Sequence, residues 1–297
     1  MIENKRASLG RNFTINTVFI LISLMCLIPF LLVVAISFSL ETDIYNHGYS
    51  IIPRNFSTLS YEYIFSNPWQ IINGYAVSTF TTVVGTIISV LMMATTGYCL
   101  ARKNFSMRRP MMFYIFFTML FNGGLVPTYI LIANYLQLKN TIWVLILPTL
   151  VNVFHIVLLR TFFSKLPEAL FESAKLDGAS ELKIFFSIAV PLSTPSLATV
   201  ALLGAMGRWN DWNLALLYID VDHLRPLQFL LQRIMADLQF FTSMPNMPPD
   251  IQAIIGSIPN ETARMAMCVL ATGPMMFVFP FFQKYFVKGL TVGSVKE

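Results

Sequence analysis

Long apolar segments alternate with short polar segments along the whole chain. Six apolar segments contain few or no charged residues and approach or exceed the roughly 20 residues that a helix needs to cross a bilayer. An open strand in lipid would leave backbone groups unpaired, so each crossing segment must be helical. The pattern therefore predicts six transmembrane helices, at about residues 13–40, 75–101, 111–134, 141–160, 195–217 and 265–283.

The polar segment between the fourth and fifth predicted spans, residues 160–191, begins with the pattern of a short helix. Pro167 can open this helix, because its fixed φ suits the first turn and its missing N–H is not needed there. Glu168 and Glu172 favour the same N-terminal end, where negative charge is stabilised. We therefore expect a helix beside the membrane, in water.

A turn and a second short helix are predicted to follow. Asp177-Gly178 is a turn signal, because glycine accepts a positive φ. Ser180 can cap a helix over residues 181–186, and Pro191 bends the chain where the fifth span begins. The segment is thus expected to form a helix–turn–helix elbow, although an ordinary amphipathic connector would share much of this pattern.

An amphipathic helix is predicted within the polar segment before the sixth span. Residues 227–241 carry apolar side chains at near-helical spacing, and Arg233 and Asp237 take the opposite face. Two interpretations stay open. The helix either lies on the bilayer surface or caps the outer mouth of a pathway, where a substrate-delivery protein would contact it.

Composition supports a membrane protein of a single transmembrane domain. The chain is 56% hydrophobic and only 12% charged, whereas soluble domains carry about 25% charged residues. Much of the surface therefore faces lipid. The three cysteines stand singly in apolar segments, without the paired spacing of a metal site or a disulfide framework.

The net charge of +5 reflects topology rather than nucleic-acid binding. With the N-terminus in the cytoplasm, 14 of the 20 basic residues but only 6 of the 15 acidic residues fall on the inner side. The inverted topology would break the positive-inside bias. Both termini are therefore expected in the cytoplasm, and no nucleic-acid partner is expected.

The elbow also carries a family signature of the form E-x-A-x-x-D-G, then nine residues, then I-x-x-P. It resembles the cytoplasmic coupling loop of binding-protein-dependent ABC importer permeases, with Ser173 in place of the usual alanine and Val190 in place of the usual leucine. The resemblance implies that the loop docks on an ATPase subunit. The residues it assigns to coupling are Glu172, Ser173, Ala174, Asp177, Gly178, Ala179, Ile188 and Pro191.

Three further segments are similar to the oligosaccharide permeases of the maltose-importer class, and the second permease of importers for complex or acidic oligosaccharides is the most similar group. They are Phe121–Tyr129 in the third span, Trp209–Trp212 at the end of the fifth, and Pro280–Gly289 at the C-terminal side. The similarity extends over nearly the whole chain. It implies an all-α, polytopic subunit of a bacterial plasma-membrane importer.

The resemblance also implies partners. The phosphate-binding pattern G-x-x-x-x-G-K-[ST] is absent from the sequence, so ATP and Mg²⁺ are expected on two separate ATP-binding cassette subunits. A sibling permease would form the other half of the pathway, and an extracellular or periplasmic binding protein would deliver the oligosaccharide. The chain itself is then not an enzyme and holds no cofactor.

The end of the fifth span is the candidate substrate pathway. Arg208 and Asp211 are ionisable residues in or near the membrane, where charge is costly and usually functional. Trp209, Asn210 and Trp212 add indole faces that stack on sugar rings and an amide that bonds to hydroxyls. The alternative is that the tryptophans belong to an interfacial belt and Arg208 pairs with Asp211.

Asn122 is a further pathway candidate, because Asn122-Gly123-Gly124 and Pro127 weaken the third span. Broken helices often lie near transport sites, although glycine can also serve close helix packing.

Two other classes of membrane protein compete with the importer. A self-contained secondary transporter or channel would use an ion gradient and would need ionisable residues near the middle of its spans, which most spans lack. An intramembrane enzyme would need a catalytic pattern, and neither H-E-x-x-H nor G-x-S-x-G occurs in the sequence.

Overall fold

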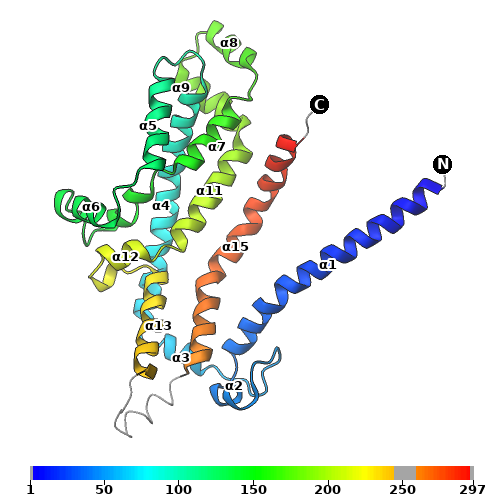
Figure 1. Cartoon of the computed structure of the whole chain (residues 1–297), viewed down its shortest axis with the longest axis vertical. Coiled ribbons are helices and arrows are strands. Elements are labelled where there is room, and N and C mark those ends of the chain that lie inside the picture. Colours follow the sequence, from blue (N-terminus) through cyan, green and yellow to red (C-terminus); the bar gives the residue numbers. More distant parts are fainter. Residues whose placement is uncertain (1–2, 244–258, 295–297) are drawn as a thin grey trace. The chain divides into compact units, whose positions relative to one another are not determined.

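The computed structural model describes residues 3–243 and 259–294, and its regular elements in those ranges are all helices (Figure 1). The β-pairing within these residues is one isolated bridge between Ser39 and Phe56. The predicted all-α class is therefore confirmed.

Three helices are long and apolar enough to cross a membrane by themselves. They are α1 (Glu3–Ser37), α4 (Pro68–Ala101) and α15 (Asn260–Ser294), with the apolar parts of the first and last at Ile15–Ser37 and Asn260–Gln283. α4 and α15 contain the second and sixth predicted spans, and α1 contains the first except for its last three residues, because α1 ends at Ser37.

The other three predicted spans are each broken and bent. The third consists of α5 (Arg108–Leu120), α6 (Leu125–Ile130) and the π-helical turn η1 (Leu131–Tyr135), with a bend of 113°. The described residues give six crossings only if each bent pair is counted as one span. The number of six spans therefore stays a prediction.

The fourth and fifth spans differ from the prediction of single helices. The fourth is formed by two 3-10 turns, η2 (Ile142–Leu145) and η3 (Leu147–Thr149), followed after a 52° bend by α7 (Val153–Phe163). The fifth begins as expected, with α11 (Thr194–Trp209), but it ends eight residues before Leu217. A separate helix, α12 (Asn213–Tyr218), follows.

The chain divides into two compact units. The first comprises residues 1–68 and 234–273 and includes α2 (Glu41–His47) and α3 (Leu59–Ile64). Within it, the Glu41 carboxylate accepts hydrogen bonds from the backbone N–H groups of Glu261 and Thr262, both at 2.9 Å. Glu41 thereby satisfies free donors at the start of α15.

The second unit comprises residues 69–233 and 274–297. In it α4, α5, α7 and α11 run side by side, with α8 and α9 at one end and α6 and α12 at the other (Figure 1). One apolar cluster joins α4, α7 and α11 near the elbow and includes buried Leu100, Leu159 and Val200. The elbow, residues 160–191, belongs to this unit.

The predicted amphipathic helix is confirmed as α13 (Leu227–Ser243), which follows a short 3-10 turn, η5 (Asp222–Leu224). Its first turn packs on α4, where the backbone N–H of Leu227 donates to the Ser78 hydroxyl at 2.9 Å. Leu227, Leu230 and Leu231 are buried, while Arg233 is exposed. Whether this helix lies on the bilayer or caps a pathway stays a prediction.

Candidate functional site

The elbow has the predicted helix–turn–helix form. The first helix, α8 (Glu168–Leu176), ends in a Schellman motif, in which the N–H of Ala179 donates to the Ala174 carbonyl and the N–H of Gly178 donates to the Lys175 carbonyl. Gly178 has a φ of +75°, a conformation that favours glycine. The Asp177-Gly178 turn therefore ends the helix by a local and sharply defined geometry.

The second half of the elbow leads directly to the fifth span. Ser180 caps α9 (Glu181–Ile184) by accepting a hydrogen bond from the N–H of Lys183. A π-helical turn, η4 (Phe185–Ala189), and a short helix, α10 (Val190–Leu192), then continue to the 82° bend before α11. The predicted bend is confirmed, and the second helix ends two residues earlier than predicted.

One face of the elbow is open to the surroundings. Glu172, Ser173, Asp177, Gly178 and Pro191 are all exposed. Two leucines lie on the same segment with most of their area uncovered, Leu176 at 89% and Leu182 at 70%. Single exposed apolar residues are common on protein surfaces, so these two leucines point to a partner only together with the family signature of the elbow.

The opposite face of the elbow packs against the helices of the second unit. Phe171 is buried, and Ala174, Ala179 and Ile188 are partly buried against the same apolar cluster. The residues assigned to coupling thus divide into an exposed set and a packed set. Movement applied to the exposed set would pass directly to the packed set.

Polar contacts hold the elbow to the end of α4. The Tyr98 hydroxyl donates to Glu181 at 3.0 Å, and Lys175 pairs with the same carboxylate at 2.6 Å. The Arg102 guanidinium lies 4.4 Å from the centre of the Phe171 ring, a cation–π contact.

A second ion pair connects the elbow to the residues just after α4. The Lys103 ammonium and the Glu168 carboxylate are 2.6 Å apart. The hydrogen bond from Lys103 lowers the pKa of Glu168 below its usual value, so this carboxylate is ionised at neutral pH. Both partners are largely exposed, so the pair contributes to position more than to stability.

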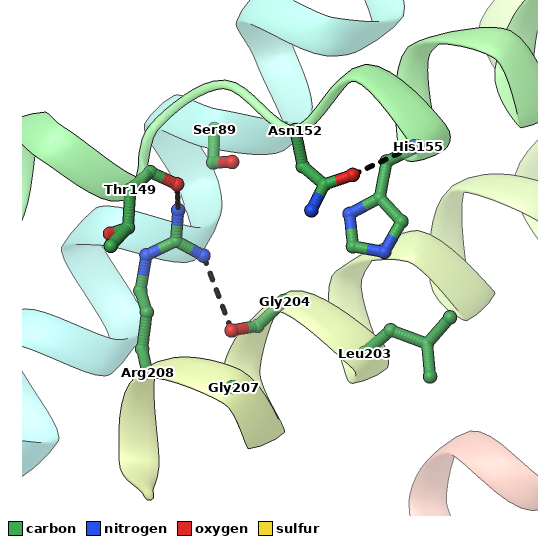
Figure 2. Close-up of a pocket in the computed structure, with 8 residues that line it drawn as sticks. All are labelled: Ser89, Thr149, Asn152, His155, Leu203, Gly204, Gly207 and Arg208. Atoms are coloured by element: carbon green, nitrogen blue, oxygen red, sulfur yellow. Dashed lines mark hydrogen bonds between the residues drawn. The ribbon is translucent and has the colours of Figure 1, made fainter. Parts of the chain in front are cut away.

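A polar cavity of about 240 Å³ lies among α4, the fourth span and α11 (Figure 2). Its chemistry is unusual for a membrane span, because charged and amide side chains converge on it. The lining residues are Ser89, Thr149, Asn152, His155, Leu203, Gly204, Gly207 and Arg208.

Arg208 is the charged group of this cavity. Its guanidinium donates to two backbone carbonyls, that of Thr149 at 2.7 Å and that of Gly204 at 3.2 Å (Figure 2). The first carbonyl is free because the fourth span breaks just beyond it. Gly85 leaves the space that the side chain occupies, since a Cβ there would lie 2.8 Å from the Arg208 Nε.

The expected alternative, an ion pair between Arg208 and Asp211, is wrong. Among the side chains that the structure describes, Arg208 forms no ion pair. The Asp211 carboxylate instead accepts hydrogen bonds from the backbone N–H groups of Asn213 and Leu214, which caps α12. The Asp211 carboxylate therefore forms its hydrogen bonds within its own chain segment and not with Arg208.

The other residues of the fifth-span motif lie in different surroundings. Trp209 is buried, and its ring centre lies 6.4 Å from that of Tyr75 on α4. Asn210 is exposed and donates to the Met206 carbonyl at 3.0 Å. Trp212 is half-buried against the apolar cluster near α12. The structure therefore brings only Arg208 of this motif into the polar cavity.

Asn122 lies at the break of the third span. Its side chain accepts a hydrogen bond from the backbone N–H of Gly124 at 2.9 Å, in the four-residue connection between α5 and α6. It is exposed and is not among the residues that line the Arg208 cavity. The predicted weakness of this span is confirmed, and its use in transport stays a prediction.

Sequence reasoning missed the residues that line the cavity together with Arg208. Asn152 caps α7 by accepting from the N–H of His155, and Ser89 donates to the Leu150 carbonyl at 2.5 Å. In the sequence, His155 is a lone histidine in the predicted fourth span, and this suggests only a packing role. A signal was present, because Pro148 followed by Asn152 is the pattern of a helix that stops and restarts.

Comparison with known proteins identifies the class of this membrane protein. Residues 93–292 match the family of binding-protein-dependent transport system inner membrane components. The chain belongs to this family. The resemblance to ABC importer permeases is thereby confirmed, and the protein is a multi-pass membrane permease subunit.

Similar proteins cover almost the full length of this permease. The polygalacturonan/rhamnogalacturonan transport system permease protein YtcP of Bacillus subtilis is 40% identical, over 93% of this chain and 95% of that one. Protein LplC of the same organism is 39% identical, over 97% and 96%. A permease chain in the crystal structure of a bacterial ABC transporter that imports the acidic polysaccharide alginate is 28% identical, with a TM-score of 0.78 over 93% of this chain and 97% of that chain.

Proposed function

We propose that this permease is one of two transmembrane subunits of an ATP-driven importer for oligosaccharides. It forms half of the translocation pathway and converts closure of the ATPase subunits into alternating access. The elbow carries this proposal, because one of its faces is exposed and the other is packed against the spans.

The geometry of the elbow suits a mechanical role. Glu172 and Gly178 lie on the exposed side, where an ATPase groove would hold them, and Leu176 offers an apolar anchor. The hydrogen bond from Tyr98 and the contact between Arg102 and Phe171 fix the elbow to α4. A push on α8 would therefore move α4 and, through η4 and α10, the bent start of α11.

The remaining partners follow from the family. A homologous second permease would complete the pathway, two ATP-binding cassette subunits would bind ATP and Mg²⁺, and a binding protein outside the membrane would deliver the sugar. Both termini and the elbow lie on the cytoplasmic side in this scheme, as the distribution of basic residues favours.

Oligosaccharides are the proposed cargo because several relatives are named for sugars. YtcP is named for polygalacturonan and rhamnogalacturonan, and the MalG protein of Thermococcus litoralis, 27% identical, is named for trehalose and maltose. In this permease Arg208, Trp209, Asn210, Asp211, Trp212 and Asn122 stay the proposed pathway residues.

A cross-linking experiment tests the docking role. Leu176→Cys, in a chain whose three native cysteines are replaced, should form a cross-link to the ATPase subunit in the assembled importer, because Leu176 lies on the exposed face of the elbow. Leu120→Cys at the end of α5 is the matched control, since Leu120 is also an exposed leucine and lies outside the elbow.

Cross-linking is read by mass spectrometry of the purified complex. A cross-link at position 176 and none at position 120 supports the docking role. Failure of Leu176→Cys to cross-link in an intact complex that contains the ATPase would contradict it.

A further inference from the structure

The charge of Arg208 has no counter-ion among the side chains that the structure describes. An ionised side chain in a membrane span is costly, and such residues usually pair with an acid or face a functional cavity. Arg208 donates to two neutral carbonyls and forms no ion pair among the described side chains. Guanidinium has five N–H donors. Two are used by the carbonyls and the Nε–H is buried without a partner, which leaves one N–H on each terminal nitrogen for another acceptor.

The lining of the cavity also favours an anion. It contains no aspartate or glutamate among its described residues. The carboxamide oxygen of Asn152 is taken by the N–H of His155, so its NH₂ group is the part left to bind a ligand. Figure 2 shows this amide nitrogen on the side that faces the cavity, across from Arg208.

The volume limits what can bind. At about 240 Å³ the cavity is smaller than the ~300–1,000 Å³ typical of pockets that hold a whole small ligand. It can hold one charged group of a larger molecule, while the rest of that molecule lies outside. The cavity is therefore a subsite and not a complete binding site.

We propose that this cavity, through Arg208 and Asn152, binds a carboxylate of the transported oligosaccharide, so that the cargo of this permease is an acidic, uronate-containing oligosaccharide. The inference rests on the proposed function as an importer. Arginine suits the role because its planar fork matches the two oxygens of a carboxylate. Two similar transport proteins are named for polymers that contain uronates, polygalacturonan and alginate.

A purely structural role for Arg208 makes a different prediction. Its hydrogen bond to Thr149 satisfies a carbonyl at the break of the fourth span, and this bond alone could account for an arginine here. A useful test must therefore change the charge balance of the cavity and leave that bond in place.

Asn152→Asp makes that change. Aspartate still caps α7, because its carboxylate accepts the N–H of His155 as the amide oxygen does. It also places a negative charge opposite Arg208, where it would compete with a substrate carboxylate. In the reconstituted importer we expect uptake of tri-galacturonate to fall about tenfold or more, with complex stability unchanged or raised.

Asn152→Ser is the comparison variant, because serine caps helices well, removes the NH₂ donor and adds no charge. We expect its uptake of tri-galacturonate to fall, but by less than that of Asn152→Asp. If Arg208 only stabilises the break, Asn152→Asp would take up tri-galacturonate as the wild type does, and the carboxylate site would be overturned.

A second pair of variants keeps the test decisive if Asn152→Asp fails to assemble. Arg208→Lys retains the positive charge and Arg208→Gln removes it, so at equal abundance the lysine variant should take up more tri-galacturonate. Equal uptake by the two would also overturn the site.

A panel of galacturonate, alginate, maltose and arabinan oligosaccharides separates this proposal from the proposed function. Preferential uptake of the acidic members supports both. ATP-dependent uptake of neutral members alone would overturn the carboxylate site and leave the importer standing. No ATP-dependent uptake of any member would overturn both.

Discussion

At the scale of single residues, the space around Arg208 depends on small neighbours. A Cβ at Gly85 would lie 2.8 Å from the Arg208 Nε and 2.9 Å from its Cδ, closer than real contacts allow. A Cβ at Gly207 would meet no atom within 4 Å. Gly85, which contacts the Arg208 side chain, thus has to be glycine, whereas Gly207, which lines the cavity, does not.

This difference gives a prediction for stability. Gly85→Ala should lower the melting temperature of the purified complex, because Arg208 must shift from its carbonyl partners, at a cost of about 1–3 kcal/mol. Gly207→Ala should leave the melting temperature unchanged or raise it, since alanine favours helix by up to about 1 kcal/mol. Equal effects in the two variants would show that Arg208 is not held as described.

At the scale of elements, contacts with the end of α4 position the elbow. The Tyr98 hydroxyl reaches Glu181 from within a buried aromatic cluster that includes Phe163 and Phe185. A hydrogen bond to a charged group contributes about 1.5–3 kcal/mol. Its loss should loosen α8 and α9 without removing the fold.

Tyr98→Phe tests this contact. We expect amide hydrogen exchange over residues 168–184 to become about tenfold faster, since roughly 1.4 kcal/mol corresponds to a factor of ten. Tyr114→Phe is the control, because Tyr114 is exposed on α5. Exchange that stays as slow as in the wild type would mean that other contacts position the elbow.

The elbow could be predicted from the sequence because its determinants are local. Gly178 ends one helix and Ser180 begins the next, and both signals fall within three residues. The break of the third span was likewise visible at Gly123-Gly124. The hydrophobic pattern alone did not predict which face of the elbow is exposed. The family signature did indicate it, because the resemblance implies that the loop docks on an ATPase subunit.

The cavity could not be predicted, because its contacts join distant parts of the chain. The bond from Arg208 to Thr149 spans 59 residues, and that from Ser89 to Leu150 spans 61. Local spacing instead suggested a pair between Arg208 and Asp211, three residues apart. That prediction failed because Asp211 caps α12, a helix break that the apolar pattern of residues 195–217 conceals.

At the scale of the whole molecule, the proposed function makes the permease one half of the translocation pathway and places ATP hydrolysis on other subunits. In this account chemical energy reaches the pathway only through the elbow. Altering the exposed face of the elbow should therefore separate ATP hydrolysis from transport and leave the permease assembled. Substitutions of the same kind elsewhere in the permease should not separate ATP hydrolysis from transport.

Gly178→Asp and Glu172→Lys are the variants that apply this test. Both residues are exposed on the elbow, and no atom lies within 4 Å of a Cβ added at Gly178. Gly48→Asp is a matched control, because Gly48 has a φ of +76°, close to the +75° of Gly178, and equally open surroundings. Any loss caused by backbone strain alone should appear in both glycine variants.

The most direct measurement follows ATP hydrolysis and oligosaccharide uptake in the same proteoliposomes that contain the complete importer. We predict that Gly178→Asp and Glu172→Lys retain hydrolysis while uptake falls about tenfold or more, and that Gly48→Asp keeps both. Wild-type uptake in both elbow variants would contradict the claim that the elbow couples the ATPase to the pathway.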